Sequence, residues 1–151
     1  MYKINIIMYL TLIVPIVAAA LAQLIKQFTV KKHRFKFKNF FAYSGMPSSH
    51  SSVVVSLATI IALQEGVNSP IFAMSIVLAL LIITDAIGLR SYLGNHGKIL
   101  NVLVKDLDED EFLDRKYPRL LEKIGHTPLQ VLAGSVLGFA VSLLAWIIFI
   151  V

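Results

Sequence analysis

Four apolar stretches constrain what this chain can fold into more than any other feature. Together they contain a single charged side chain, that of Asp85, and they occupy residues 4–25, 49–64, 71–89 and 129–151. An α-helix needs about 20 such residues to cross roughly 30 Å of hydrocarbon. With 57% apolar residues and a mean hydropathy of +0.77, the chain is too apolar for an ordinary soluble domain. We therefore predict an all-α integral membrane helical bundle of about four transmembrane helices, folded as one domain over residues 1–151.

The cations are concentrated in the connections between these stretches. Six of the 14 Lys and Arg residues lie at positions 26–38 and seven at positions 90–123, which are on the same side of a four-span bundle. Because basic connections stay in the cytoplasm, we predict that both large polar connections are cytoplasmic and that both termini face outward. The net charge of +5 then meets anionic headgroups, so we expect membrane lipids as partners and no nucleic acid.

The two polar connections are expected to contain interfacial helices. The first mixes its cations with phenylalanines, which is typical of a segment lying on the headgroup layer, and we expect a second such helix within residues 110–124. The acidic patch at 106–111 lacks the glycine and the spacing of a calcium loop, so it is interpreted as a solvated surface. Since the chain has no cysteine either, we predict no metal or cofactor.

A short polar motif, Ser-Gly-Met-Pro-Ser-Ser-His-Ser-Ser, precedes the second apolar stretch. Gly45 and Pro47 end any helix arriving from the N-terminal side, while Ser48 or Ser49 can cap the next helix and place His50 in its first turn. The unpaired N–H groups of that turn, its serine hydroxyls and the helix dipole suit an oxyanion such as phosphate. The alternative is a plain serine-rich cap with a histidine at the membrane interface.

A carboxylate and a guanidinium lie at the end of the third apolar stretch. Asp85 is costly inside a membrane unless it is paired or faces a polar cavity. Arg90 follows at a spacing of five, which differs from the three or four of a helical ion pair, so we expect each to have another partner.

The last apolar stretch begins at a second histidine. His126 precedes Thr127 and Pro128, which suit the N-cap and the first helical position. Gly134 and Gly138 then give this helix a smooth face for close packing, which would also allow a homodimer.

Taken together, these motifs resemble the divergent branch of the type 2 phosphatidic acid phosphatase superfamily, whose relatives include lipid phosphatases and vanadium-dependent haloperoxidases. The resemblance covers nearly the whole chain. It is carried by Gln23 to Lys26, Ser44 to His50, Asp85 to Arg90, Leu100 with Asn101, and His126 to Gly138.

The resemblance implies roles for the residues of the first half. The Pro-Ser-Ser-His segment is similar to the Pro-Ser-Gly-His motif of the superfamily, so Ser48 and Ser49 would bind phosphate and His50 would be the general acid. Lys26 would take the place of the phosphate-binding lysine of another motif, with Arg34 as a weaker candidate.

The superfamily motif Ser-Arg-x5-His-x3-Asp is split in this chain. By resemblance Arg90 would bind phosphate and His126 would be the nucleophile, with Gln130 in the place of the aspartate that orients it. His96 has the expected spacing from Arg90 and is the alternative nucleophile. Four further residues would shape or line the site, namely Gly45, Pro47, Asp85 and Asn101.

The function implied by the resemblance is a membrane-embedded lipid phosphate phosphatase. It would hydrolyse a phosphomonoester at the cytoplasmic face without a metal, through a phosphohistidine. Gln130 cannot supply the negative charge of an aspartate, which leaves open a non-catalytic binding or assembly protein that retains the fold. A small lipid carrier, with Asp85 and Arg90 lining a polar path, is the third alternative.

Overall fold

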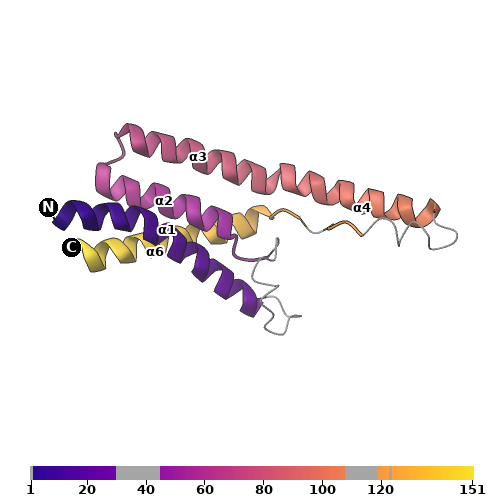
Figure 1. Ribbon diagram of the computed structural model, residues 1–151, viewed down its shortest axis with the longest axis horizontal. Coiled ribbons are helices and arrows are strands. Elements are labelled where there is room, and N and C mark those ends of the chain that lie inside the picture. Colours follow the sequence, from indigo (N-terminus) through magenta and orange to yellow (C-terminus); the bar gives the residue numbers. More distant parts are fainter. Residues whose placement is uncertain (1, 30–44, 108–118, 123) are drawn as a thin grey trace.

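The computed structural model describes residues 2–29, 45–107, 119–122 and 124–151, and every regular element in these ranges is a helix. The helices are α1 (Tyr2–Thr29), α2 (Ser49–Glu65), α3 (Pro70–Ile87), α4 (Leu89–Leu107) and α6 (Pro128–Phe149), as Figure 1 shows. The predicted all-α class is therefore confirmed.

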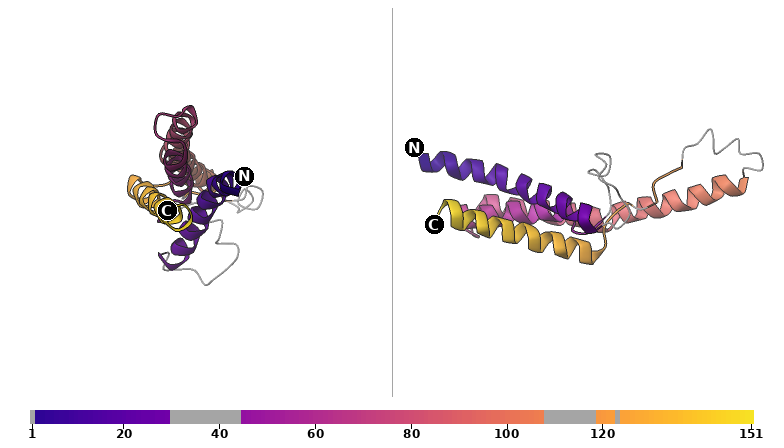
Figure 2. Two further views of the ribbon diagram at one scale, coloured as in Figure 1. Left: turned by 90° about the vertical axis from the view of Figure 1, so that its left-hand side faces the viewer. Right: turned by 90° about the horizontal axis from the view of Figure 1, so that it is seen from below.

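Four of these helices form an antiparallel bundle with α2 at its centre. Helices α1 and α3 run in one direction and α2 and α6 in the other, so both termini lie at the same end (Figures 1 and 2). Helix α2 packs against α1, α3 and α6. Eight of its 17 residues are buried, against three of the 18 residues of α3. The other helices therefore turn a larger share of their surface outward, toward lipid.

Three stretches of helix are long and apolar enough to cross a membrane: Met8–Thr29, Pro70–Asp106 and Pro128–Phe149. They overlap three of the four predicted spans. The fourth, α2, has 17 residues and is about 25 Å long at 1.5 Å per residue. It lies alongside the others, and its polar side chains are tolerated because neighbouring helices enclose them.

Helices α2 and α6 pack closely through small residues. The facing positions repeat every four residues, as Ser48, Ser52 and Ser56 on α2 and Gly134, Gly138 and Ser142 on α6. A Cβ atom on Gly138 would collide with the backbone oxygen of Ser52. One step further on, the Ser56 and Ser142 hydroxyls hydrogen bond at 2.8 Å. The smooth glycine face predicted for α6 is thus covered by α2, and a homodimer would need another surface.

Helix α4 continues beyond the bundle along the direction of α3 (Figure 1). This helix was not predicted from the sequence, where residues 91–123 form a polar region. Asn101 accepts a hydrogen bond from the Leu120 N–H at 2.9 Å and donates one to the Leu120 carbonyl at 2.9 Å. Gly94 and Gly97 give the same segment room, since a Cβ on either would collide with its backbone. The chain is thereby led back along α4 to the bundle.

The predicted interfacial helices are largely untested. The segment at 30–44 lies outside the described residues, and so does most of the one expected within 110–124. The described part of the latter, residues 119–122 and 124, is not helical, and there the prediction is wrong. Its backbone pairs with the Asn101 side chain on α4 instead of with itself.

Candidate functional site

Polar side chains from α1, α2, α3 and α4 and from the segment before α6 meet at the end of the bundle opposite the termini. The Arg90 Nη1 atom lies 3.4 Å from the His50 Nε2 atom, and the rings of His50 and His126 have centroids 5.6 Å apart with an interplanar angle of 73°. The residues gathered here are Lys26 from α1, Ser48, Ser49 and His50 from the start of α2, Asp85 and Arg90 from the α3–α4 junction, and His126 before α6.

Asp85 and Arg90 form a direct ion pair, which corrects the expectation that each has another partner. Arg90 Nε donates to Asp85 Oδ2 at 2.7 Å. A spacing of five becomes compatible with pairing because Gly88, with φ −90° and ψ −83°, breaks the helical register between the two residues. The carboxylate holds Arg90 through Nε, while Nη1 lies beside His50.

The start of α2 is the helix N-terminus that the sequence predicts. Ser48 is the N-cap, and its hydroxyl accepts the Ser51 N–H at 3.5 Å. The Ser48 N–H donates to the Gln130 carbonyl at 2.9 Å, which ties this turn to α6. The N–H groups of Ser49 and His50 come too early in the helix to have intrahelical acceptors, so they can serve an oxyanion.

Not every serine of the motif belongs to this site. The Ser51 hydroxyl donates to the Val131 carbonyl at 2.9 Å, and the Ser52 hydroxyl donates to the Ala18 carbonyl at 3.2 Å. These two hydroxyls fasten α2 to α6 and to α1. The expectation that they help to bind the oxyanion is therefore wrong, because their protons are already used in helix packing.

The loop before α2 passes closely over the buried Lys26 side chain. Gly45 has φ +150°, and a Cβ there would lie 2.9 Å from Lys26 Cγ and Cδ. Pro47 is buried, and the Thr29 hydroxyl donates to the Met46 carbonyl at 2.7 Å. Gly45 and Pro47 thus shape the loop that covers Lys26.

His126 is held by its backbone and not by its ring. Its N–H donates to the Ala86 carbonyl at 2.9 Å, and Gly125, with φ +99°, lies against Ser91 too closely for a Cβ. The side chain is buried, and neither ring nitrogen has a hydrogen-bond partner among the described residues. A ligand bound between the histidines could satisfy them.

The electrostatics of the site favour an anion. Burial, and then the charges of Lys26, His50 and Arg90, lower the pKa of His126 to about 4. The imidazole is therefore neutral near pH 7, which is the form that can attack phosphorus. The negative charge of a bound phosphate would offset the positive charges that keep this ring unprotonated.

The pKa of His126 leads to a testable prediction. Because it is lowered from 6.5 to about 4, the stability linked to this ring is fully present above pH 6.5 and is lost as the pH falls toward 4. We expect the ring resonances in NMR spectra of detergent-solubilised protein to titrate near pH 4, and to titrate higher when phosphate is added. His126→Gln assigns the resonance. Titration near 6.5 without phosphate would contradict this electrostatic description.

Gln130 does not take the place of the orienting aspartate. Its side-chain oxygen accepts the Thr127 N–H at 3.0 Å, and its own N–H donates to the Thr127 hydroxyl at 3.3 Å, which completes a capping box. The structure thus shows Gln130 in a structural role at the start of α6. It leaves the His126 ring without the partner expected from the resemblance.

Two predicted site residues lie away from the histidine pair. His96 is exposed on α4, about two turns beyond Arg90, and makes no hydrogen bond or ring contact with the site residues in the described part of the chain. Asn101 binds the returning segment and contributes to the site only by positioning the chain that leads to His126.

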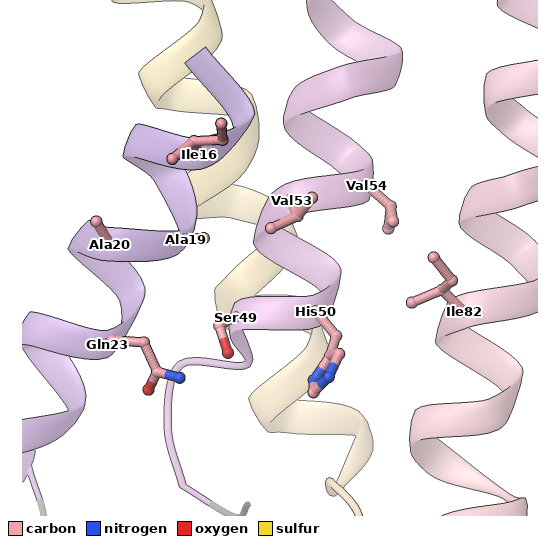
Figure 3. A pocket seen from close by; sticks show the side chains of 9 residues that line it. All are labelled: Ile16, Ala19, Ala20, Gln23, Ser49, His50, Val53, Val54 and Ile82. Carbon is pink, nitrogen blue, oxygen red and sulfur yellow. The ribbon is translucent and has the colours of Figure 1, made fainter. Parts of the chain in front are cut away.

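Two cavities reach the histidines from different sides. A groove of about 430 Å³ runs along α2 between α1 and α3, and Gln23, Ser49 and His50 lie at one end of it (Figure 3). A second cavity of about 340 Å³ is lined by His126, Ser91 and Gln130, among others. Gln23 is among the residues that carry the resemblance, but it was not predicted as a site residue.

A family match spans the residues of this site. The family model described as the divergent PAP2 family matches residues 8–141, which include the whole site. The chain belongs to the divergent PAP2 family. One relative, the uncharacterised membrane protein YuiD of Bacillus subtilis (strain 168), is 32% identical over 144 residues, covering 87% of this chain and 90% of YuiD. No solved structure matches the chain.

Proposed function

We propose that this protein hydrolyses a lipid phosphomonoester through a phosphohistidine on His126. The observation that carries the proposal is the position of His50 and Arg90, whose side chains lie 3.4 Å apart beside the neutral His126 ring. Arg90, Lys26 and the first turn of α2 supply positive charge and N–H donors for the phosphate oxygens, which is the main requirement of phosphoryl transfer.

The reaction has two steps. First a His126 ring nitrogen attacks phosphorus, and the bond from phosphorus to the lipid oxygen breaks. His50, which is protonated while the bound phosphate offsets the charge of Arg90, gives its proton to the leaving alcohol. Water then attacks the phosphohistidine, the phosphorus–nitrogen bond breaks, and neutral His50 takes a proton from that water. Phosphate leaves, and both histidines return to their starting states. In this scheme Lys26 and Arg90 replace a metal ion.

The same proposal includes an orientation. Thirteen of the 14 Lys and Arg residues follow Ile25 and precede Ile124, in the two connections that join the helices at the site end. The positive-inside rule then directs the site toward the cytoplasmic leaflet.

A second candidate function has one specific observation in its favour. No carboxylate among the described residues hydrogen bonds to the His126 ring, and the Gln130 side chain is engaged in the helix cap. A protein with this site could bind a lipid phosphate without hydrolysing it.

One experiment separates the two functions. Purified protein in detergent micelles is incubated with dioleoyl phosphatidic acid, with and without EDTA, and both released phosphate and acid-labile phosphate on the protein are measured. Hydrolysis predicts release that EDTA does not reduce, with label on the peptide that contains His126. Saturable binding of the lipid without release would instead establish the binding function.

A further inference from the structure

The groove that ends at His50 has no role in the chemistry described above. It lies on α2 between α1 and α3, and Figure 3 shows its apolar residues extending from the polar end along the helices. These residues are Ile16, Ala19, Ala20, Val53, Val54 and Ile82. Because α1 and α3 contain predicted membrane spans, the groove lies at the depth of the hydrocarbon, where an acyl chain can enter from the side.

Helix α1 presents three kinds of side chain to this region in order. Ala20, Gln23 and Lys26 are three residues apart, so they lie near one face of the helix, each about 4.5 Å further along its axis. The alanine lines the apolar part of the groove and the amide lines its polar end, while the ammonium belongs to the phosphate site. This order matches the tail, the linkage and the phosphate of a glycerol-based lipid.

The amide of Gln23 is suited to a ligand with a polar linkage. Its Oε1 atom is buried and has no hydrogen-bond partner among the described residues. A glycerol hydroxyl could donate to it, and after an amide rotation an ester carbonyl could accept from it. A polyprenyl phosphate has hydrocarbon directly next to its phosphate ester oxygen, and it would leave this amide facing methylene and methyl groups.

We propose that the groove binds one acyl chain of a glycerol-based lipid phosphate and that Gln23 hydrogen bonds to the linkage between chain and phosphate. This inference rests on the proposed function for its choice of headgroup. It adds a binding groove for one acyl chain and a specificity residue that does not touch the reacting atoms.

The first test measures the selectivity of Gln23→Leu. We expect its KM for dioleoyl phosphatidic acid to rise about tenfold with kcat changed by less than about twofold, since the amide binds away from the reacting bond. The ratio of kcat/KM for dioleoyl phosphatidic acid to that for a polyprenyl phosphate should fall about tenfold. An unchanged ratio, or a loss confined to kcat, would overturn the role given to Gln23.

The second test fills the groove. In Ala20→Phe the ratio of kcat/KM for dioleoyl phosphatidic acid to that for glycerol 3-phosphate should fall about tenfold. Ala140→Phe is the matched control, because Ala140 is exposed on α6 and does not line the groove. A fall in both variants, or in neither, would overturn the assignment of the groove. Thermal unfolding in detergent identifies any variant that fails to fold.

A third measurement does not require turnover. Phosphatidic acid carrying a diazirine on one acyl chain should label peptides of α1 and α2 on irradiation, and Ala20→Phe should lose that label while Ala140→Phe keeps it. If the wild type releases no phosphate but this labelling holds, the hydrolysis fails and the groove stands. If phosphate is released but labelling is the same in both variants, the hydrolysis stands and the groove assignment is wrong.

Discussion

Phosphate release from dioleoyl phosphatidic acid should fall by about a thousandfold or more in His126→Gln, because this change removes the attacking nitrogen while keeping a polar side chain. The rest of the site would remain in place, since the backbone N–H of residue 126 still donates to the Ala86 carbonyl. Binding of the lipid should therefore be retained, and the loss should appear in kcat. Single-turnover measurements should also show no acid-labile phosphate on the variant.

The matched control is His96→Gln, the same change at an exposed position of α4. If His126 is the nucleophile, His96→Gln retains the wild-type rate and the phosphohistidine. If release persists in His126→Gln and disappears in His96→Gln, the nucleophile is His96, and the geometry of the histidine pair would then have no catalytic meaning.

The sequence was sufficient to predict the membrane class and most of the candidate site, because both depend on local chemistry. Long apolar stretches have few folded alternatives, and a serine-rich cap before an apolar run fixes where His50 lies on its helix. The structure then brings His50 beside Arg90 and His126, which the resemblance had related but could not place in space.

The predictions that failed depended on the path of the backbone between elements. The Asp85–Arg90 pair forms because of one non-helical glycine, and a count of residues cannot reveal that break. Gln130 has an equally local explanation, since three residues after Thr127 is also the spacing of a capping box. Gln130 therefore suited two roles, the residue that orients the histidine and the last residue of a capping box. The hydrogen bond at 3.0 Å from the Thr127 N–H to its side chain shows the capping role.

The position of α2 shows a different limit of sequence reasoning. Its serines look like a polar cap followed by a weak span, yet Ser52 and Ser56 are fully buried against other helices. Whether a polar residue in a span faces lipid, water or another helix is decided by packing between distant segments. The Gly134 and Gly138 spacing on α6 was the one sequence signal of that packing, and it did not identify α2 as the partner.

The contact of Gly138 on α6 with Ser52 on α2 is where we expect a substitution to have its largest effect on folding. Gly138→Leu would place a side chain where the Ser52 backbone now lies, so α2 and α6 must separate. We expect a loss of about 3 kcal/mol in the free energy of unfolding, at the upper end for overpacked cores, and a fall in Tm of roughly 6–12 °C. Gly138→Ala should lie between this variant and the wild type, because its single methyl group requires a smaller separation.

Activity should fall together with stability in this series, even at temperatures where the variants remain folded. The α2–α6 contact connects the two halves of the site, since His50 lies in the first turn of α2 and His126 precedes α6. Between them the Ser48 N–H donates to the Gln130 carbonyl at 2.9 Å. Ala140→Leu, on the exposed face of the same helix, should leave both Tm and rate near wild type. If Gly138→Leu keeps the wild-type Tm and rate, the close packing of these helices is not what holds the two histidines 5.6 Å apart.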